Sequence, residues 1–237
     1  MTLAKRVRKF YKEPMRNYRY LNGLTVSFVT LLLCSNLIGA AKVCSLFGFS
    51  FGAGILFFPL TYLFTDILTE VYGYQQSRKA VWSGFCAMLF ASTVSFVVLL
   101  MPPDPEWHHQ KAFETVFGQT PRLVLGSLTA YFFGEFLNSY VLAKLKIATQ
   151  GRRLWLRILI STIFGEAVDS ALFYPIAFYA VWPNKLLLTV MVTNYALKVI
   201  WEMLMTPFTY RIVNYLKKAE SEDYYDYKTN FSPWRFQ

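Results

Sequence analysis

The chain has 237 residues, of which 55% are hydrophobic and only 16% are charged. Soluble domains carry about 25% charged residues, so too few polar side chains are present to cover a soluble enzyme of this length. The aromatic content of 19% excludes a disordered chain. The net charge of +10 could indicate nucleic-acid binding, but no soluble domain follows the basic N-terminus, so we expect no nucleic-acid partner. An integral membrane protein is the class that remains.

Basic residues cluster at the start of the chain, where residues 1–19 hold seven lysines and arginines and one acid, Glu13. Such a cluster directly before an apolar run is typical of a cytoplasmic flank. The apolar run has the full length of a membrane span and continues into further apolar sequence, so a cleaved signal peptide is not expected. Residues 1–20 are therefore predicted to be a basic cytoplasmic segment.

Six apolar segments of about the length of a membrane span follow. Their predicted ranges are 21–41, 47–72, 80–101, 123–145, 154–180 and 186–210. If the N-terminus is cytoplasmic, seventeen lysines and arginines flank the spans on the inner side and four on the outer side. Because basic residues favour the cytoplasmic side, this alternation fits six spans.

The sequence thus predicts an all-α integral membrane protein, a bundle of six transmembrane helices with both termini in the cytoplasm. The membrane domain is expected at 21–215, and residues 216–237 are expected to form a cytoplasmic C-terminal tail. The tail is mixed in charge and lacks a hydrophobic period, so we expect it to be mobile.

Two groups of residues outside this pattern could carry chemistry. Cys34, Cys44 and Cys86 lie in apolar sequence without metal-ligand spacing, which predicts buried thiols and no disulfide framework. His108 and His109 lie near two acids in the longest outer loop. Adjacent residues do not share a helical face, so a solvated loop is expected and a metal site is the minor alternative.

Acidic residues inside the predicted spans are the main functional signal. One acid near the middle of a span costs about 2.5–3.5 kcal/mol on insertion scales, so the set should face a shared polar interior. A single basic residue, Lys198, accompanies these acids. The six acids are Asp66, Glu70, Glu135, Glu166, Asp169 and Glu202.

Helical spacing places these residues on one face of each of four segments. The four stripes are Asp66 with Glu70; Glu135 with Asn138; Glu166 with Asp169 and Ser170; and Asn194 with Lys198 and Glu202. Six carboxylates against one lysine suit a donor-rich or cationic ligand, and the flanking aromatic rings could stack on a flat heterocycle. Structural roles stay open as alternatives: interhelical hydrogen bonds for Asn36 and Asn138, and an ion pair between Lys198 and Glu202.

Catalytic motifs are absent from the sequence: it has no phosphate-binding loop, no zinc-protease helix and no nucleophile elbow. We therefore expect no enzyme activity and no cofactor. Asp66 and Asp169 could form the pair of an intramembrane aspartyl protease, but the surrounding residues do not resemble those families. A transporter is predicted, with a membrane binding subunit that needs an energising partner as the alternative.

The stretch 58–73 (FPLTYLFTDILTEVYG) resembles the signature of the bacterial queuosine precursor transporter family, sometimes grouped with vitamin uptake transporters. Residues 35–36 (SN), 165–170 (GEAVDS) and 195–198 (YALK) match further family positions, and the resemblance covers roughly 20–215. It implies import of 7-cyano-7-deazaguanine and 7-aminomethyl-7-deazaguanine across the bacterial inner membrane, for queuosine modification of tRNA.

Such a base presents an N1–H and a 2-amino group on one edge, which one carboxylate can accept together, and its aminomethyl form is cationic. We expect Glu166 or Asp169 to accept this edge, and Asp66 and Glu70 to pair with Arg78 as a gate. The expected substrate-binding residues are Asn36, Asp66, Glu70, Glu135, Glu166, Asp169, Asn194, Tyr195 and Lys198.

Small residues such as Gly48 and Gly52 allow close helix packing and leave a homodimer open.

Overall fold

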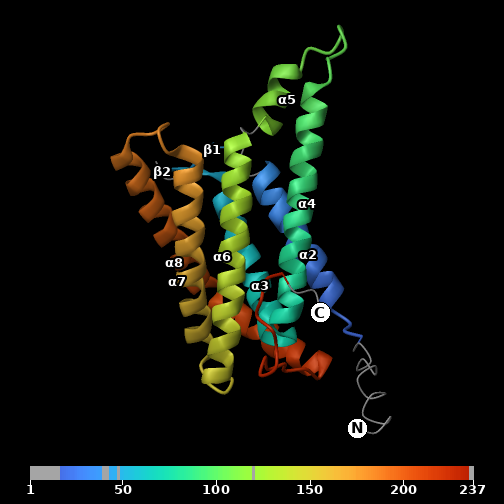
Figure 1. Ribbon diagram of the computed structural model, residues 1–237, viewed down its shortest axis with the longest axis vertical. Coiled ribbons are helices and arrows are strands. Elements are labelled where there is room, and N and C mark those ends of the chain that lie inside the picture. Colours follow the sequence, from blue (N-terminus) through green and yellow to red (C-terminus); the bar gives the residue numbers. More distant parts are fainter. Residues whose placement is uncertain (1–16, 39–42, 47–48, 119–120, 235–237) are drawn as a thin grey trace, which may run out of the picture.

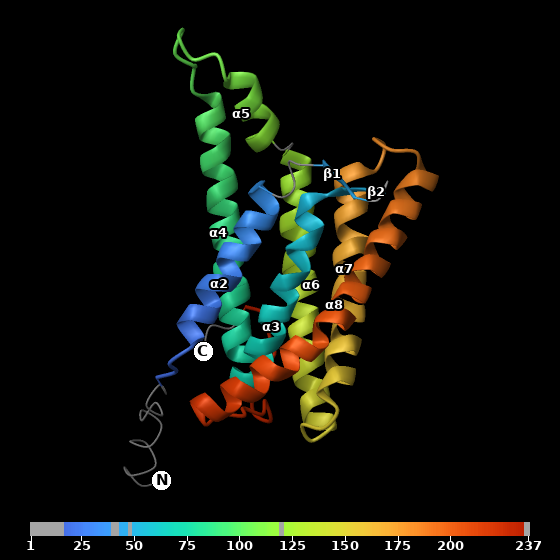
Figure 2. The ribbon, with the colours of Figure 1, turned by 180° about the vertical axis from the view of Figure 1, so that it is seen from behind.

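The computed structural model describes residues 17–38, 43–46, 49–118 and 121–234. Long helices lie side by side along the longest axis, with a short hairpin towards one end and the C-terminal segment against the other (Figures 1 and 2). The helices are α2 (Leu21–Leu33), α3 (Phe58–Tyr72), α4 (Tyr74–Leu100), α5 (Gln110–Phe117), α6 (Pro121–Ala148), α7 (Leu154–Phe178) and α8 (Asn184–Glu220).

The glycine-rich start of the second predicted segment is not helical. Strands β1 (Val43–Leu46) and β2 (Phe49–Gly52) form an antiparallel hairpin, followed by a 3₁₀ turn at Ala53–Leu56. The prediction of one helical segment over 47–72 is therefore wrong in its first part. Helix α3 begins only at Phe58, with a proline in its first turn, and its 15 residues give a length of about 22 Å.

Helix α3 is the centre of the bundle, since twelve of its fifteen residues are buried. It contacts α2, α4, α6 and α8. At its end Gly73 adopts φ 84° and ψ 167°, a conformation that favours glycine, and this lets α4 begin one residue later in a new direction. The two acids of α3 are therefore surrounded by other helices.

Large apolar side chains are exposed on the outer faces of the long helices, while charged side chains are buried between them. Phe90, Leu100, Phe164 and Leu204 are each more than half exposed, whereas Glu135 is fully buried. Among the described residues, α4 and α8 are the helices long and apolar enough to cross a membrane. An apolar exterior around a polar interior is the distribution expected of a protein in lipid.

The C-terminal tail, described up to residue 234, packs against the helices, in contrast to the mobile extension that was expected. Beyond α8 the chain turns back across the end of the bundle where α8 passes under α3 (Figure 2). The Asp226 carboxylate accepts the Tyr74 amide at the start of α4, Arg78 donates to the carbonyls of Asn230 and Ser232, and Trp82 donates to the Pro233 carbonyl. These contacts pair donors of α4 with the tail.

The cysteines also differ from expectation. Cys34 and Cys86 are exposed and Cys44 is partly exposed, and all three are free thiols. The prediction of buried thiols was wrong because many apolar side chains of this bundle lie on its outer surface.

Candidate functional site

The buried acids of α6 and α7 are brought together by a close helix crossing. A side-chain Cβ built on Gly165 would lie 2.8 Å from Cβ of Asn138 and 3.1 Å from the Gly134 carbonyl. One built on Gly134 would lie 2.7 Å from the Tyr62 hydroxyl and 3.0 Å from Cβ of Asp169. Only glycine fits at either position without displacing a neighbour, so the two helices approach closely beside α3.

Lys198 of α8 is the cation at this crossing. Its ammonium lies 2.5 Å from Asp169 Oδ2 and 2.8 Å from Glu166 Oε2, and 4.6 Å from the centre of the Phe58 ring. The lysine side chain is 11% exposed and Glu166 is 1% exposed. Two carboxylates and an aromatic face thus surround one ammonium group, as they would surround a cationic ligand.

The acids of α3 and α6 form a second layer without a cation. Asn138 donates to Asp66 Oδ1 at 2.7 Å, and the Thr65 hydroxyl donates to Glu135 Oε2 at 2.7 Å. All four side chains are fully buried. Within the described ranges, the second oxygen of each carboxylate has no hydrogen-bond partner. This layer can accept more protons or donors than the protein supplies.

Glu202 completes this interior, because both of its carboxylate oxygens are buried without a hydrogen-bond partner in the described part of the chain. The alternative ion pair between Lys198 and Glu202 is not formed, since Lys198 contacts the acids of α7. Residues four apart on α8 share a face, but the lysine side chain reaches the neighbouring helix.

Glu70 lies in a different, charge-balanced cluster at the end of the bundle that carries the tail. Its Oε1 is 3.0 Å from Arg157, 2.6 Å from Lys217 and 3.7 Å from Lys146. The predicted gate pairing with Arg78 is wrong, because these three cations bind Glu70 and Arg78 donates to the tail.

Asp223 of the tail bridges the two lysines of this cluster, at 2.5 Å from Lys146 and 2.8 Å from Lys217. Partial burial opposes its ionisation, but the hydrogen bonds and charges of these lysines outweigh burial and hold the pKa of the Asp223 carboxyl below its usual value. The tail therefore supplies a carboxylate that offsets the repulsion between the ammonium groups of Lys146 and Lys217.

The remaining predicted binding residues, Asn36, Asn194 and Tyr195, donate hydrogen bonds to carbonyl and hydroxyl oxygens. Asn36, in a π-helical stretch at Cys34–Ile38, donates to the Leu32 carbonyl of its own helix. Asn194 donates to the Tyr174 hydroxyl at 2.7 Å, and the Tyr195 hydroxyl donates to the Ile163 carbonyl at 3.3 Å. Both bonds join α8 to α7.

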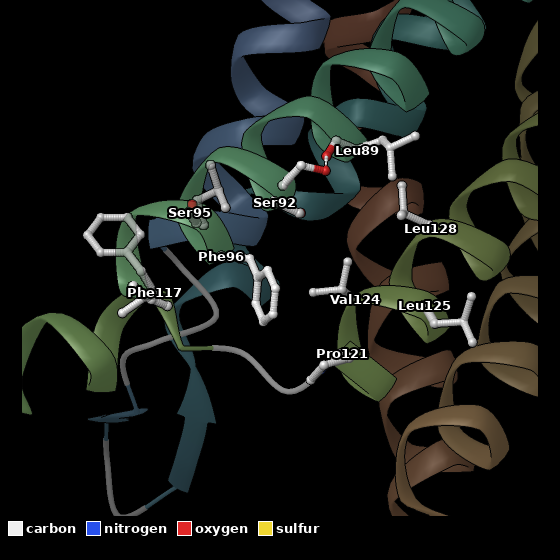
Figure 3. Close-up of a pocket in the computed structure, with 12 residues that line it drawn as sticks. Leu89, Ser92, Ser95, Phe96, Phe117, Pro121, Val124, Leu125 and Leu128 are labelled. Carbon is white, nitrogen blue, oxygen red and sulfur yellow. Dashed lines mark hydrogen bonds between the residues drawn. The ribbon is translucent and has the colours of Figure 1, made fainter. Parts of the chain in front are cut away.

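A cavity of about 380 Å³ lies elsewhere, between α4, α5 and α6 (Figure 3). Leu89, Phe96, Val124 and Leu128 line it, with Ser92, Thr93 and Ser95 as the polar side chains. None of the described residues that line it is charged. A ligand with several hydrogen-bond donors finds acceptors at the carboxylates rather than here.

Sequence reasoning missed the cations around Glu70, and it treated Tyr62 only as one of the aromatic rings that flank the polar stripes. Arg157 and Lys146 were counted only as charges that flank the predicted spans on the cytoplasmic side. Glu70 was expected near the same end of its own span, so the three side chains could have been predicted to lie at one level of the bundle. Tyr62 is fully buried at the glycine crossing, and its hydroxyl has no partner within the described residues. Its position four residues before Asp66, on the same face of α3, was the available signal.

Comparison with known proteins places this chain in a family. Residues 52–212 match the family model described as "Putative vitamin uptake transporter". The chain is 34% identical over 189 residues to the "Probable queuosine precursor transporter" of Bacillus subtilis, covering 79% of this chain and 82% of that protein. It is 28% identical over 164 residues to the "Queuosine precursor transporter" of Escherichia coli, covering 69% and 71% respectively.

No solved structure matches the chain significantly. The family match spans α3 to α7 and most of α8, and so includes the four helices α3, α6, α7 and α8 that carry the buried carboxylates of the interior. The chain therefore belongs to the queuosine precursor transporter family, within the family of vitamin uptake transporters.

Proposed function

We propose that this protein imports queuosine precursors, 7-cyano-7-deazaguanine and 7-aminomethyl-7-deazaguanine, across the bacterial inner membrane. The names of its relatives support the substrate class. The observation that carries the assignment to a site is the excess of buried acids at the α6–α7 crossing. There, the ammonium of Lys198 is shared by two carboxylates, while further carboxylate oxygens have no hydrogen-bond partner among the described residues.

The substrate binds at Glu166 and Asp169. One carboxylate accepts the N1–H and 2-amino group of the base, and the Phe58 ring, which already faces the Lys198 ammonium at 4.6 Å, offers an aromatic surface. Lys198 then donates to the ring carbonyl. Charge-assisted bonds of this kind are about twice as strong as neutral ones, which makes them suited to discrimination between heterocycles.

The chain crosses the membrane six times within residues 21–215, with residues 1–20 and 216–237 in the cytoplasm. Contacts between its two ends support an even number of spans: Glu220 accepts the Tyr20 amide at 2.7 Å, and Glu222 accepts the Tyr18 hydroxyl at 3.1 Å. Both ends therefore lie on one side. The basic residues that flank the spans make this side the cytoplasm.

Uptake by the purified protein in liposomes tests the proposal. Labelled 7-cyano-7-deazaguanine is expected to exchange across the membrane and to be recovered chemically unchanged. Binding without flux would instead favour a subunit that depends on an energising partner, and an altered product would indicate an enzyme.

Neutral isosteres test the site. Asp169→Asn is expected to weaken binding by about 1–3 kcal/mol, because a substrate donor loses its charged acceptor. Glu166→Gln removes the second contact of Lys198 and should act in the same direction. Glu114→Gln, on the exposed helix α5, is the matched control and should leave binding unchanged. Full affinity and uptake in both Asp169→Asn and Glu166→Gln would show that this part of α7 is structural.

A further inference from the structure

Glu202 is the one acid of the described interior whose carboxylate the protein leaves entirely without a hydrogen bond or ion pair. The residue is 1% exposed, and neither oxygen has a partner in the described ranges. Asp66 and Glu135 each accept one hydrogen bond, and Glu166 and Asp169 share Lys198.

The charges around Glu202 do not compensate an ionised carboxylate. The carboxylates that repel an ionised Glu202 electrostatically are those of Asp66 on α3, Glu166 on α7 and Glu135 on α6. Lys198, one turn away on α8, is held by the α7 carboxylates at 2.5 and 2.8 Å. A buried charge without donors is far more costly than the neutral acid, so the arrangement accommodates Glu202 as a carboxylic acid.

A second buried group points to the same conclusion. The Tyr62 hydroxyl is fully buried without a hydrogen-bond partner in the described part of the chain, and it lies at the glycine crossing between α6 and α7. The Tyr62 phenol interacts electrostatically with the carboxylates of Glu166, Asp169 and Glu135. A phenol both donates and accepts hydrogen bonds, so it can follow a change of protonation among these acids.

We propose that Glu202 binds the proton that couples substrate uptake to the proton gradient. This inference rests on the proposed transport function and adds its energy source. A proton from water on the outer side forms an O–H bond with a Glu202 oxygen, the chain then closes around the neutral acid, and the proton returns to water on the cytoplasmic side. No other bond is made or broken.

Burial explains why the proton would be obligatory. Closing the bundle around Glu202 removes it from water, and no donor in the described ranges bonds to the carboxylate to replace its hydration. The loaded carrier therefore changes conformation readily only when Glu202 is protonated. A proton needs a single oxygen, whereas a metal ion of the size of Ca²⁺ needs about six or more oxygen ligands.

Two transport modes in liposomes separate coupling from transport itself. Exchange of labelled for unlabelled 7-cyano-7-deazaguanine requires no driving force and tests the proposed function. Accumulation driven by an acidic exterior, with the membrane potential clamped, tests coupling. The cyano compound is used because it carries no ammonium charge of its own. A gradient of about two pH units supports up to about hundredfold accumulation for one proton per substrate.

Glu202→Gln keeps the shape of the neutral acid and cannot release a proton. We expect it to retain exchange within about twofold and to lose at least tenfold in gradient-driven accumulation. Glu202→Asp restores an ionisable group and should accumulate substrate, which guards against a folding defect in the glutamine variant. Glu114→Gln, an exposed acid of α5, is the control and should match the parent protein in both modes.

Three results would overturn the inference: undiminished pH-driven accumulation by Glu202→Gln, exchange by the parent protein without any response to the pH gradient, or accumulation driven by sodium instead. A loss of exchange in the parent protein would instead contradict the proposed function. A lumenal pH dye gives a direct reading, since substrate entry should acidify the lumen for the parent protein and not for Glu202→Gln.

Discussion

The ion-pair cluster of Glu70, Asp223, Lys146, Arg157 and Lys217 tests how the tail is held against the helices. Asp223 is bound by Lys146 at 2.5 Å and Lys217 at 2.8 Å, and both lysines also lie near Glu70. Asp223→Asn keeps the size of the side chain and removes its charge. Two lysines and Arg157 would then share one carboxylate, so their mutual repulsion should loosen the contact between the tail and the helices.

The size of the effect follows from burial. Hydrogen bonds to charged groups contribute about 1.5–3 kcal/mol each. Asp223 is 43% exposed, however, and water screens such pairs, while Lys146 is only 1% exposed. We therefore expect a loss of about 1–2 kcal/mol. For a chain of this length about 1 kcal/mol corresponds to about 2–4 °C, so the apparent Tm should fall by about 2–8 °C.

Thermal unfolding of the detergent-solubilised protein measures this difference, with Asp104→Asn in the exposed outer loop as control. The pH dependence supplies a second check. The folded pKa of Asp223 is lowered, so its contribution is present above its unfolded pKa of about 3.9 and is lost as the pH falls through the folded pKa. The two proteins should differ at neutral pH and converge in strong acid. Equal Tm values at neutral pH would refute the bridging role of Asp223.

Two further predictions concern packing. Gly165→Ala would place a Cβ 2.8 Å from that of Asn138, so α6 and α7 must separate. We therefore expect a lower Tm and reduced uptake. Gly23→Ala is the control, because a Cβ there has no atom within 4 Å, and it should match the parent protein in both assays. Trp82→Phe removes a 2.8 Å hydrogen bond to the tail, so trypsin should cleave after the exposed Lys228 about fivefold faster, as expected for a loss of about 1 kcal/mol; an unchanged cleavage rate would show that this bond does not hold the tail.

Hydropathy and helical spacing located most of the bundle, because a long apolar run in a helix carries its own signal. The prediction at 154–180 agrees closely with helix α7 at Leu154–Phe178. The same signal failed at the start of the second predicted segment, where Phe49–Gly52 is a strand paired with Val43–Leu46 and Ala53–Leu56 is a 3₁₀ turn. Apolar runs of this length fit a paired strand as well as a helix.

Partner choice was less predictable than position. Spacing placed Lys198 and Glu202 on one face of α8, but it carried no information about the neighbouring helix, and the lysine contacts Asp169 of α7. The prediction of a mobile tail failed for a related reason. Its order depends on Arg78 and Trp82, which donate to tail carbonyls across more than 150 residues of sequence. Such contacts arise only once the fold is assembled.

The distribution of buried charge separates structure from function in this bundle. At the end of the bundle that carries the tail, Glu70 and Asp223 contact Lys146, Arg157 and Lys217, so two acids are matched by three cations, with each ion pair within 3.7 Å. A network that only stabilised the fold would be matched in this way throughout, since an unpaired buried charge is destabilising. The interior above this cluster is different.

In that interior five acids, Asp66, Glu135, Glu166, Asp169 and Glu202, accompany the single cation Lys198 among the described residues. Packing does not require this excess, because glutamine or an apolar residue would fill the same volume without a desolvation cost. Two kinds of ligand can neutralise the excess negative charge. A substrate can donate hydrogen bonds to the acids of α7, and a proton can neutralise Glu202 of α8. This excess is what the proposed substrate site on α7 and the proposed proton site on α8 both require.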